Sequence, residues 1–442
     1  MEQREHKLWE TIDGQRELYV GLLQDLVRAS EGGDEATQRF VAEKFGDFGC
    51  DEVEVITADP RELPIEHEFV EPGKMEPGER VSVVGRRQGS GQGSSMLFWA
   101  HPDTPPVTDT ESWEHDPFAG TIEGNRLYGW GASDDLAGVA LMTCALHATL
   151  SADLSPQGSV MLGSTASKGY AQGIIAVLEQ GYEADASIYV HPAESGAGLK
   201  DIKAVTCGQL TFRVIIPGQP PDTTEPGHTA FYHRAVNPVS KIGIVYDAFR
   251  RLDEERGEEV SYAPLEEAIG RATNLDVTYV RCGGDYRPSS VDTRCELVGA
   301  VLFPPGESLE QVQSQVVKAV EEAAQQDEWL KEHPPTIEWV RGVSQGTEVP
   351  VDHPLYQTVE QAITRVTGIK PRNYLLHPGS DIRNPVLHSG IPTIGFGPLG
   401  GSSTQIGGRD EWVDLDDYIR AVKVAGAIIL DWCGVEPVAS AA

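Results

Sequence analysis

The chain has 442 residues, enough for two or three domains with real hydrophobic cores, and its 40% hydrophobic content excludes disorder as the main state. Acidic residues outnumber basic ones 68 to 35, for a formal net charge of −33, and only 11 of the basic residues are lysine. This charge excludes nucleic acid as a partner, because phosphates would be repelled and no basic cluster offsets the repulsion. The sequence has no apolar run long enough to cross a membrane and no signal-peptide core, so we predict a cytoplasmic protein without a membrane partner.

The six cysteines lie far apart and form no Cys-x-x-Cys motif. We therefore predict neither a thiolate zinc site nor a disulfide framework, and we interpret the cysteines as buried free thiols. They are Cys50, Cys144, Cys207, Cys282, Cys295 and Cys433.

The first two hundred residues alternate between helical and strand patterns. Helical spacing covers residues 16–46 in two segments, broken by a turn at 31–34, and a β-rich stretch follows at 52–57. Further strands are predicted at 95–100, 159–164 and 186–190, with helices at 136–150 and 170–180. Alternating strands and helices predict a largely parallel sheet that is covered by helices on both faces.

The pattern changes after residue 203. Residues 210–216 alternate like a half-exposed strand. The region is completed by predicted helices at 237–251 and 309–326 and predicted strands at 277–281, 295–303 and 336–340. The first pattern then returns, with helices at 354–367 and 415–432 and a strand ending near 394–396. We predict an α/β catalytic domain of residues 1–203 and 344–442, interrupted by a smaller α+β domain at 204–343.

Two predicted strand ends carry chemically useful side chains, and ligands gather at the carboxyl ends of strands in open α/β sheets. The strand at 95–100 runs into His101 and Asp103, a pair that can act as a metal ligand and its orienting acceptor. A glycine-rich turn places Asp134 and Asp135 at the start of the next helix. Alone, the His101 and Asp103 pair is a weak signal that is more often structural, and the Asp134 and Asp135 pair is as readily a cap of the following helix.

The order of the motifs resembles the aminoacylase, acetylornithine deacetylase and succinyl-diaminopimelate desuccinylase family of co-catalytic zinc hydrolases. The resemblance covers nearly the whole chain and implies a zinc-exopeptidase-like α/β domain with a mostly parallel sheet, interrupted by an α+β lid that forms a homodimer. The segments that carry it are 101–107, Trp113 with 116–118, 127–135, 227–228 with Asn237, 303–308, 379–383, 390–398 and 410–413.

The resemblance implies a metal site, because members of that family hold two metals bridged by one aspartate, which Asp134 matches. One metal would be completed by His101 and by His191, which stands at a strand end where a carboxylate is usual. Imidazole is a good ligand there as well. A one-residue shift of the alignment would offer Glu194 instead.

The two further ligands that the family uses for its second metal are absent from this sequence. Lys168 and Gly407 stand at the two ligand positions, and Ser167 stands where the general base is expected. The Lys168 ammonium would then occupy the second site as a counter-charge for Asp134, or it simply points to solvent. We therefore predict one divalent metal per site, zinc in preference to manganese or cobalt.

Three side chains are candidates for roles beside the metal. Asp103 would orient His101, and Asp135 or Glu194 would take up a proton. The resemblance also implies that His228, from a partner chain, stabilises developing negative charge, and His233 is its nearby alternative.

The substrate site departs from the family pattern. The usual Asp-x-Arg of the lid strand is replaced by residues 300–302, Ala-Val-Leu, so a frequent carboxylate-binding arginine is absent. We expect Arg383, or alternatively Arg294, to replace it, and Asn237 to contact substrate.

The leading hypothesis is a metal-dependent hydrolase of the deacylase or amidohydrolase class, which cleaves an amide or related C–N bond in a small polar molecule. The main alternative is a non-catalytic dimeric relative that serves as a binding or scaffold protein. A third hypothesis is a non-haem iron enzyme, because two histidines and one carboxylate also form that site.

Overall fold

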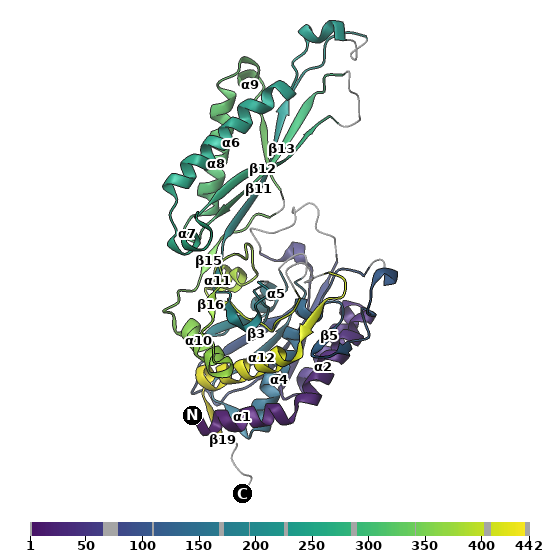
Figure 1. The fold of residues 1–442 in the computed structure, drawn as a ribbon, viewed down its shortest axis with the longest axis vertical. Helices are drawn as coiled ribbons and strands as arrows, with labels where there is room; N and C mark the ends of the chain where they lie inside the picture. Colours follow the sequence, from purple (N-terminus) through teal and green to yellow (C-terminus); the bar gives the residue numbers. More distant parts are fainter. Residues whose placement is uncertain are drawn as a thin grey trace. The chain divides into compact units, whose positions relative to one another are not determined.

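The computed structural model describes residues 2–64, 78–107, 110–167, 172–193, 195–224, 229–283, 290–340, 342–401 and 408–437. These residues fall into two compact units (Figure 1). The first unit holds the described residues up to 205 and from 348 onward, and the second holds those within 206–347. The second unit is therefore an insertion into the first.

A six-stranded sheet forms the centre of the first unit, in the order β1-β2-β7-β3-β8-β17. Neighbours among β7, β3, β8 and β17 run parallel, whereas β1 and β2 add antiparallel pairs at one edge. The mainly parallel sheet predicted from the sequence is confirmed. The strands are β1 (Glu52–Ala58), β2 (Arg80–Arg87), β3 (Met96–Ala100), β7 (Val160–Ser164), β8 (Ala186–Tyr189) and β17 (Thr393–Gly395).

Helices cover both faces of this sheet, as successive residues of β3 illustrate. Met96 and Phe98 pack into the large core with α4, whereas Leu97 and Trp99 pack with α5 on the opposite face. The helices are α1 (Glu2–Gly14), α2 (Arg16–Ala29), α3 (Asp34–Asp47), α4 (Ala137–Ser151), α5 (Gly173–Glu179), α10 (Pro354–Thr367), α11 (Arg383–Ser389) and α12 (Leu415–Ile428). No helix in the described ranges combines the length and the apolar character that a membrane span requires.

Several short sheets of two or three strands accompany the main sheet. The strand β5 (Arg126–Tyr128) lies between β4 (Thr121–Glu123) and β18 (Trp412–Asp414). The remaining pairs are β6 (Leu154–Pro156) with β19 (Val435–Pro437), β9 (Asp201–Ile202) with β16 (Arg372–Asn373), and β10 (Val205–Thr206) with β15 (Thr347–Glu348).

The second unit is an antiparallel four-stranded sheet, in the order β12-β13-β11-β14, packed against helices. Alternate residues of β11, such as Phe212 and Val214, are buried against α6 and α8, as a half-exposed strand requires. The fold class expected from the sequence, an α/β domain interrupted by α+β structure, is confirmed. The elements are β11 (Gly208–Pro217), β12 (Asn274–Cys282), β13 (Arg294–Phe303), β14 (Thr336–Trp339), α6 (Val239–Glu259), α7 (Ala263–Ile269), α8 (Leu309–Ala324) and α9 (Glu328–Glu332).

One pair of cysteines corrects the expectation of free thiols. Cys282 and Cys295 form a disulfide, with their Cα atoms 4.2 Å apart. The two residues are opposite one another in the register of β12 and β13, so strand pairing and not sequence spacing brings the sulfurs together. The other four cysteines are buried and form no disulfide, as expected.

Candidate metal centre

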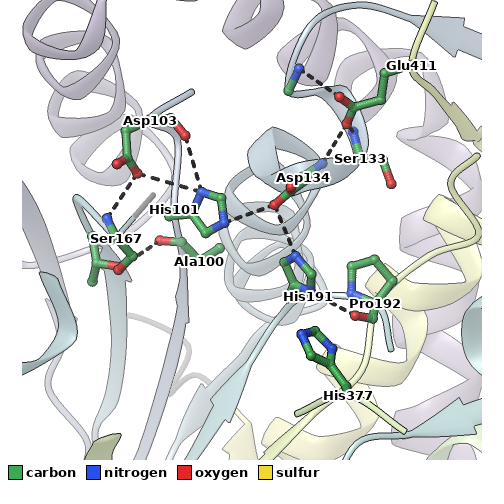
Figure 2. Close-up of polar contacts among 12 residues, drawn as sticks. Ala100, His101, Asp103, Ser133, Asp134, Ser167, His191, Pro192, His377 and Glu411 are labelled. Carbon is green, nitrogen blue, oxygen red and sulfur yellow. Dashed lines mark hydrogen bonds and ion pairs between the residues drawn. The ribbon is translucent and has the colours of Figure 1, made fainter. Parts of the chain in front are cut away.

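Three buried side chains meet at one edge of the main sheet. His101 directly follows β3, His191 lies two residues beyond β8, and Asp134 lies in the turn before α4. Because β3 and β8 are parallel neighbours, their carboxyl ends reach the same edge. One ligand atom from each of the three residues lies within 4.8 Å of the other two (Figure 2).

The hydrogen-bond partners of both histidines prepare this cluster for a cation. The Nδ1 of His101 lies 3.3 Å from the Asp103 carbonyl oxygen, and the Nδ1 of His191 lies 2.7 Å from the Pro192 carbonyl oxygen. A carbonyl only accepts, so each Nδ1 carries the hydrogen and each Nε2 keeps a lone pair. These Nε2 atoms lie 3.0 and 3.1 Å from Asp134 Oδ1. Three lone-pair donors therefore converge, and a divalent metal fits them.

The donor set suits a catalytic metal site. Two imidazoles and one carboxylate are three protein ligands, which leaves a coordination position for water or substrate on zinc. The same donors also suit manganese, cobalt or iron, so the set does not select one metal. Within the described part of the chain, this is the one cluster of three or more potential ligands close enough to hold an ion.

Glu411 holds the turn that carries Asp134. Its side chain has no exposed surface, and its Oε1 accepts hydrogen bonds from the backbone N–H groups of Ser133 and Asp134 at 2.7 and 2.8 Å (Figure 2). Its Oε2 accepts from the N–H of Gly131 at 3.2 Å. The pairing of β18 with β5 delivers this carboxylate to the turn. In the sequence Glu411 stands only as part of a motif, so this role was missed there.

Asp103 approaches His101 with two groups. Its carboxylate Oδ1 lies 3.6 Å from His101 Nδ1, farther than its own carbonyl oxygen at 3.3 Å. The same Oδ1 accepts a hydrogen bond from the backbone N–H of Ser167 at 3.0 Å. Ser167 is buried, and its hydroxyl is 2.9 Å from that of Thr165. The backbone carbonyl of Asp103 is thus the nearer partner of the histidine.

Asp135 lies beside the cluster with no exposed surface. Burial raises the pKa of its carboxyl well above the ordinary value, and the charges of His101 and Lys203 offset this only in part. A carboxyl with a raised pKa can carry a proton near neutral pH, as a general acid must.

Lys203 and His377 extend the polar cluster behind His191, and neither was among the residues predicted from the sequence. The Lys203 Nζ lies 3.2 Å from His191 Nδ1 and 3.5 Å from His377 Nδ1. Burial lowers the pKa of His377 well below its ordinary value, and the charge of Lys203 acts in the same direction. His377 is therefore neutral at physiological pH. Lys203 is one of 11 lysines and stands in no motif, so no sequence signal singles it out.

Arg383 lies at the start of α11 and is buried. Its Nη1 donates to the carbonyl oxygen of Gly379 and lies 3.5 Å from Asp381 Oδ1. Burial raises the pKa of Asp381, and the charges of Arg383, Lys203 and the two histidines of the cluster lower it. Arg383 therefore stabilises the loop that precedes it, through its contacts with Gly379 and Asp381.

The remaining predicted site residues belong to the second unit or lie outside the residues that the structure describes. Asn237 is exposed, and its Oδ1 accepts from the backbone N–H of Val239 at the start of α6. His233 is exposed, and Arg294 pairs with Glu296 at 3.4 Å. Four predicted residues lie outside the described residues, namely Lys168, Glu194, His228 and Gly407.

Solved structures with the same fold include several peptidases. Aminopeptidase PepT from Bacillus cereus has a TM-score of 0.67 and 16% identity, over 94% of this chain and 98% of that one. Human carnosine dipeptidase 1 has a TM-score of 0.66 and 14% identity, over 97% and 98% of the two chains. The YXEP protein of Bacillus subtilis, described as a dinuclear metal-binding peptidase of the M20 family, has a TM-score of 0.59 and 14% identity, over 95% and 99%.

A family model extends this likeness of fold to the sequence. The model of peptidase family M20/M25/M40 matches residues 97–431, about three quarters of the chain. The matched region contains every residue of the metal-ligand cluster and also Glu411. The chain therefore belongs to peptidase family M20/M25/M40.

Proposed function

We propose that this protein is a metal-dependent hydrolase that cleaves an amide or related C–N bond in a small polar substrate. The convergence of the His101 and His191 Nε2 atoms on Asp134 carries the proposal, because it presents lone pairs that a divalent metal satisfies. Such a metal supplies Lewis acidity and activates water. Membership of a peptidase family supports the reaction class. The ordered motifs support the deacylase branch as the finer assignment.

Residues of the chain would orient the metal ligand His101, transfer a proton and contact the substrate. Asp103 would hold the His101 ring through its carbonyl and carboxylate oxygens. Asp135, whose pKa is raised by burial, would hold or move a proton, with Glu194 as the alternative. Arg383 and Asn237 are proposed to contact substrate, and for Arg383 the support is its place beside the cluster.

We further propose one metal per site, zinc in preference to manganese or cobalt. The support is the residue types at the two second-metal ligand positions, where Lys168 and Gly407 offer no carboxylate or imidazole, and at the general-base position, where Ser167 stands. The dinuclear YXEP relative provides the contrast, because its description states that two metals are bound.

The second unit is proposed to form a cytoplasmic homodimer in which His228 serves the partner's site. The support is that β12 ends the four-stranded sheet with Tyr279 and Val280 about half exposed, at 51% and 50%. Such an edge is a ready template for pairing with a second copy. Light scattering of the full chain should give about twice 47.9 kDa, and a fully active monomer would contradict both the dimer and the role of His228.

Metal analysis of protein purified without chelator tests the central proposal. About one ion per chain, together with hydrolysis of dipeptides or N-acyl amino acids, is expected, and His191→Ala should lose both. The matched control is His6→Ala, an exposed histidine whose loss should change neither. No bound ion would favour the non-catalytic alternative, and two ions would show that the ligand assignment is wrong.

A further inference from the structure

Lys203 is a lysine without exposed surface, and the backbone holds it in place. Its N–H donates to the carbonyl oxygen of Gly395 at 2.8 Å, and the N–H of Gly395 donates back at 2.7 Å. A methyl group on Gly395 would come within 2.8 Å of the Lys203 Cε. The glycine at the end of β17 thus leaves the space through which the lysine stem passes, and the side chain has a defined path to the metal-ligand cluster.

The end of the Lys203 side chain lies directly behind His191. Its Nζ is 3.2 Å from His191 Nδ1, 3.3 Å from the Pro192 carbonyl oxygen and 3.5 Å from His377 Nδ1. It also lies 4.9 Å from the centre of the Tyr189 ring. A carbonyl oxygen, the lone pair of a neutral imidazole such as His377 and an aromatic face are all partners that suit an ammonium group.

Two effects of this ammonium on the metal centre have opposite signs. By holding the Pro192 carbonyl it could help to orient His191, which would strengthen metal binding. Its positive charge, one imidazole ring away from the metal-binding nitrogen, repels a divalent cation and would weaken binding. The charge effect dominates, because His191 already donates to Pro192 at 2.7 Å and keeps that partner without the lysine.

We propose that Lys203 is a fixed internal cation that lowers the affinity of the His101, Asp134 and His191 centre for its divalent metal. The inference rests on the proposed function, since it assumes that these residues hold a metal. Lys203 acts through His191 and the local field and has no exposed surface with which to touch substrate, so it is a positioning residue and not a catalytic one.

The same charge acts on an acid beside the cluster. The charge of Lys203 lowers the pKa of Asp381, against the effect of burial. The lysine thus balances negative charge that a metal would otherwise balance alone.

Zinc affinity of neutral variants of the full chain tests the proposal. Lys203→Met should bind zinc about 10-fold more tightly than wild type in a competition titration with a chromophoric chelator at one fixed pH, because the repulsion is removed. Lys203→Arg, which keeps the charge, should stay near wild type. Lys370→Met, which removes an exposed lysine of the same unit, should leave the affinity unchanged. Added zinc should also raise the melting midpoint more in Lys203→Met than in wild type.

The contrary results separate this proposal from the function that it builds on. A folded Lys203→Met that binds zinc no better than wild type would overturn the proposal, while one ion in the wild type would leave the metal centre intact. Zinc binding by neither protein would overturn both. If Lys203→Met fails to fold, Lys203→Gln repeats the measurement with a donor kept toward Pro192. Failure of both neutral variants to fold would show that the lysine is structural and would overturn the proposal.

Discussion

Lys203 in the first unit and Arg256 in the second are both buried cations, and they have different surroundings. In the second unit, Arg256 forms two hydrogen bonds with the Glu307 carboxylate, at 2.8 and 3.1 Å, and others with Thr273 and Gln315. In the first unit, Lys203 faces two imidazoles and a carbonyl oxygen. Arg256 has an opposite charge and a planar match, as structural ion pairs do. Arg256 therefore has the surroundings of a structural ion pair, whereas Lys203 contacts the imidazole of the candidate metal ligand His191.

Loss of Asp134 should have the largest effect, because it removes metal binding from the first unit, where Lys203 lies. Asp134→Ala removes the one carboxylate at which both Nε2 atoms converge, so we expect zinc binding and hydrolysis to be abolished. Metal analysis after dialysis and a substrate assay measure this. The variant should still fold by circular dichroism, and retention of one tightly bound zinc would contradict the assigned ligand set.

Removal of Arg256, the buried cation of the second unit, should reduce stability without changing metal binding. Arg256→Met leaves the Glu307 carboxylate without its buried partner, and breaking such a pair costs about 3 kcal/mol of unfolding free energy. Urea unfolding gives the loss, and zinc affinity should stay at the wild-type value. Arg250→Met is the matched control, because Arg250 pairs with Glu254 at an exposed site. Equal losses in the two variants would remove the distinction between the buried and the surface pair.

Substitution of Glu411 in the first unit should change zinc affinity by a smaller amount. Glu411→Gln keeps the shape of the side chain but weakens the charge-assisted bonds to the N–H groups of Gly131, Ser133 and Asp134. We expect zinc affinity to fall by about 10-fold, as for other groups that orient a ligand. Isothermal titration measures the affinity. An unchanged affinity would show that the turn holds Asp134 without this carboxylate.

At neutral pH the smallest predicted effect comes from buried thiols, which reduce stability only as the pH becomes alkaline. Burial raises the pKa of Cys207 to about 11 and that of Cys50 to about 12, whereas both thiols ionise near 9.0 in the unfolded chain. Their contribution is thus complete below pH 9 and is lost as the pH rises through the folded values, by at most about 1.4 kcal/mol per pH unit for each thiol. Cys207→Ser should flatten the fall of the urea midpoint between pH 9 and 11. If the urea midpoint of Cys207→Ser falls as steeply with pH as that of wild type, the buried Cys207 thiol is not a source of the alkaline loss of stability.

Local pattern determined most of the secondary structure. The helix predicted at 354–367 is found as α10, Pro354–Thr367, because its apolar spacing and the proline at its start both act within a few residues. The N-terminal helix α1 was not predicted, because its short sequence buries only Leu8 and Ile12 and its apolar stripe is weak. Predicted strand ends and a glycine-rich turn likewise point to His101, Asp134 and His191, because each of these residues stands within a few positions of the local signal that marks it.

The sequence by itself thus determined the fold class, the order of the elements and the residues that converge as candidate ligands, because periodicity, turn chemistry and motif order are written locally. Only the tertiary structure decided which distant groups meet. Glu411 bonds to a turn 277 residues earlier in the chain, Cys282 finds Cys295 through strand register, and Lys203 reaches His191 past a glycine of β17. These contacts depend on the packing of whole elements, and no spacing along the chain encodes them.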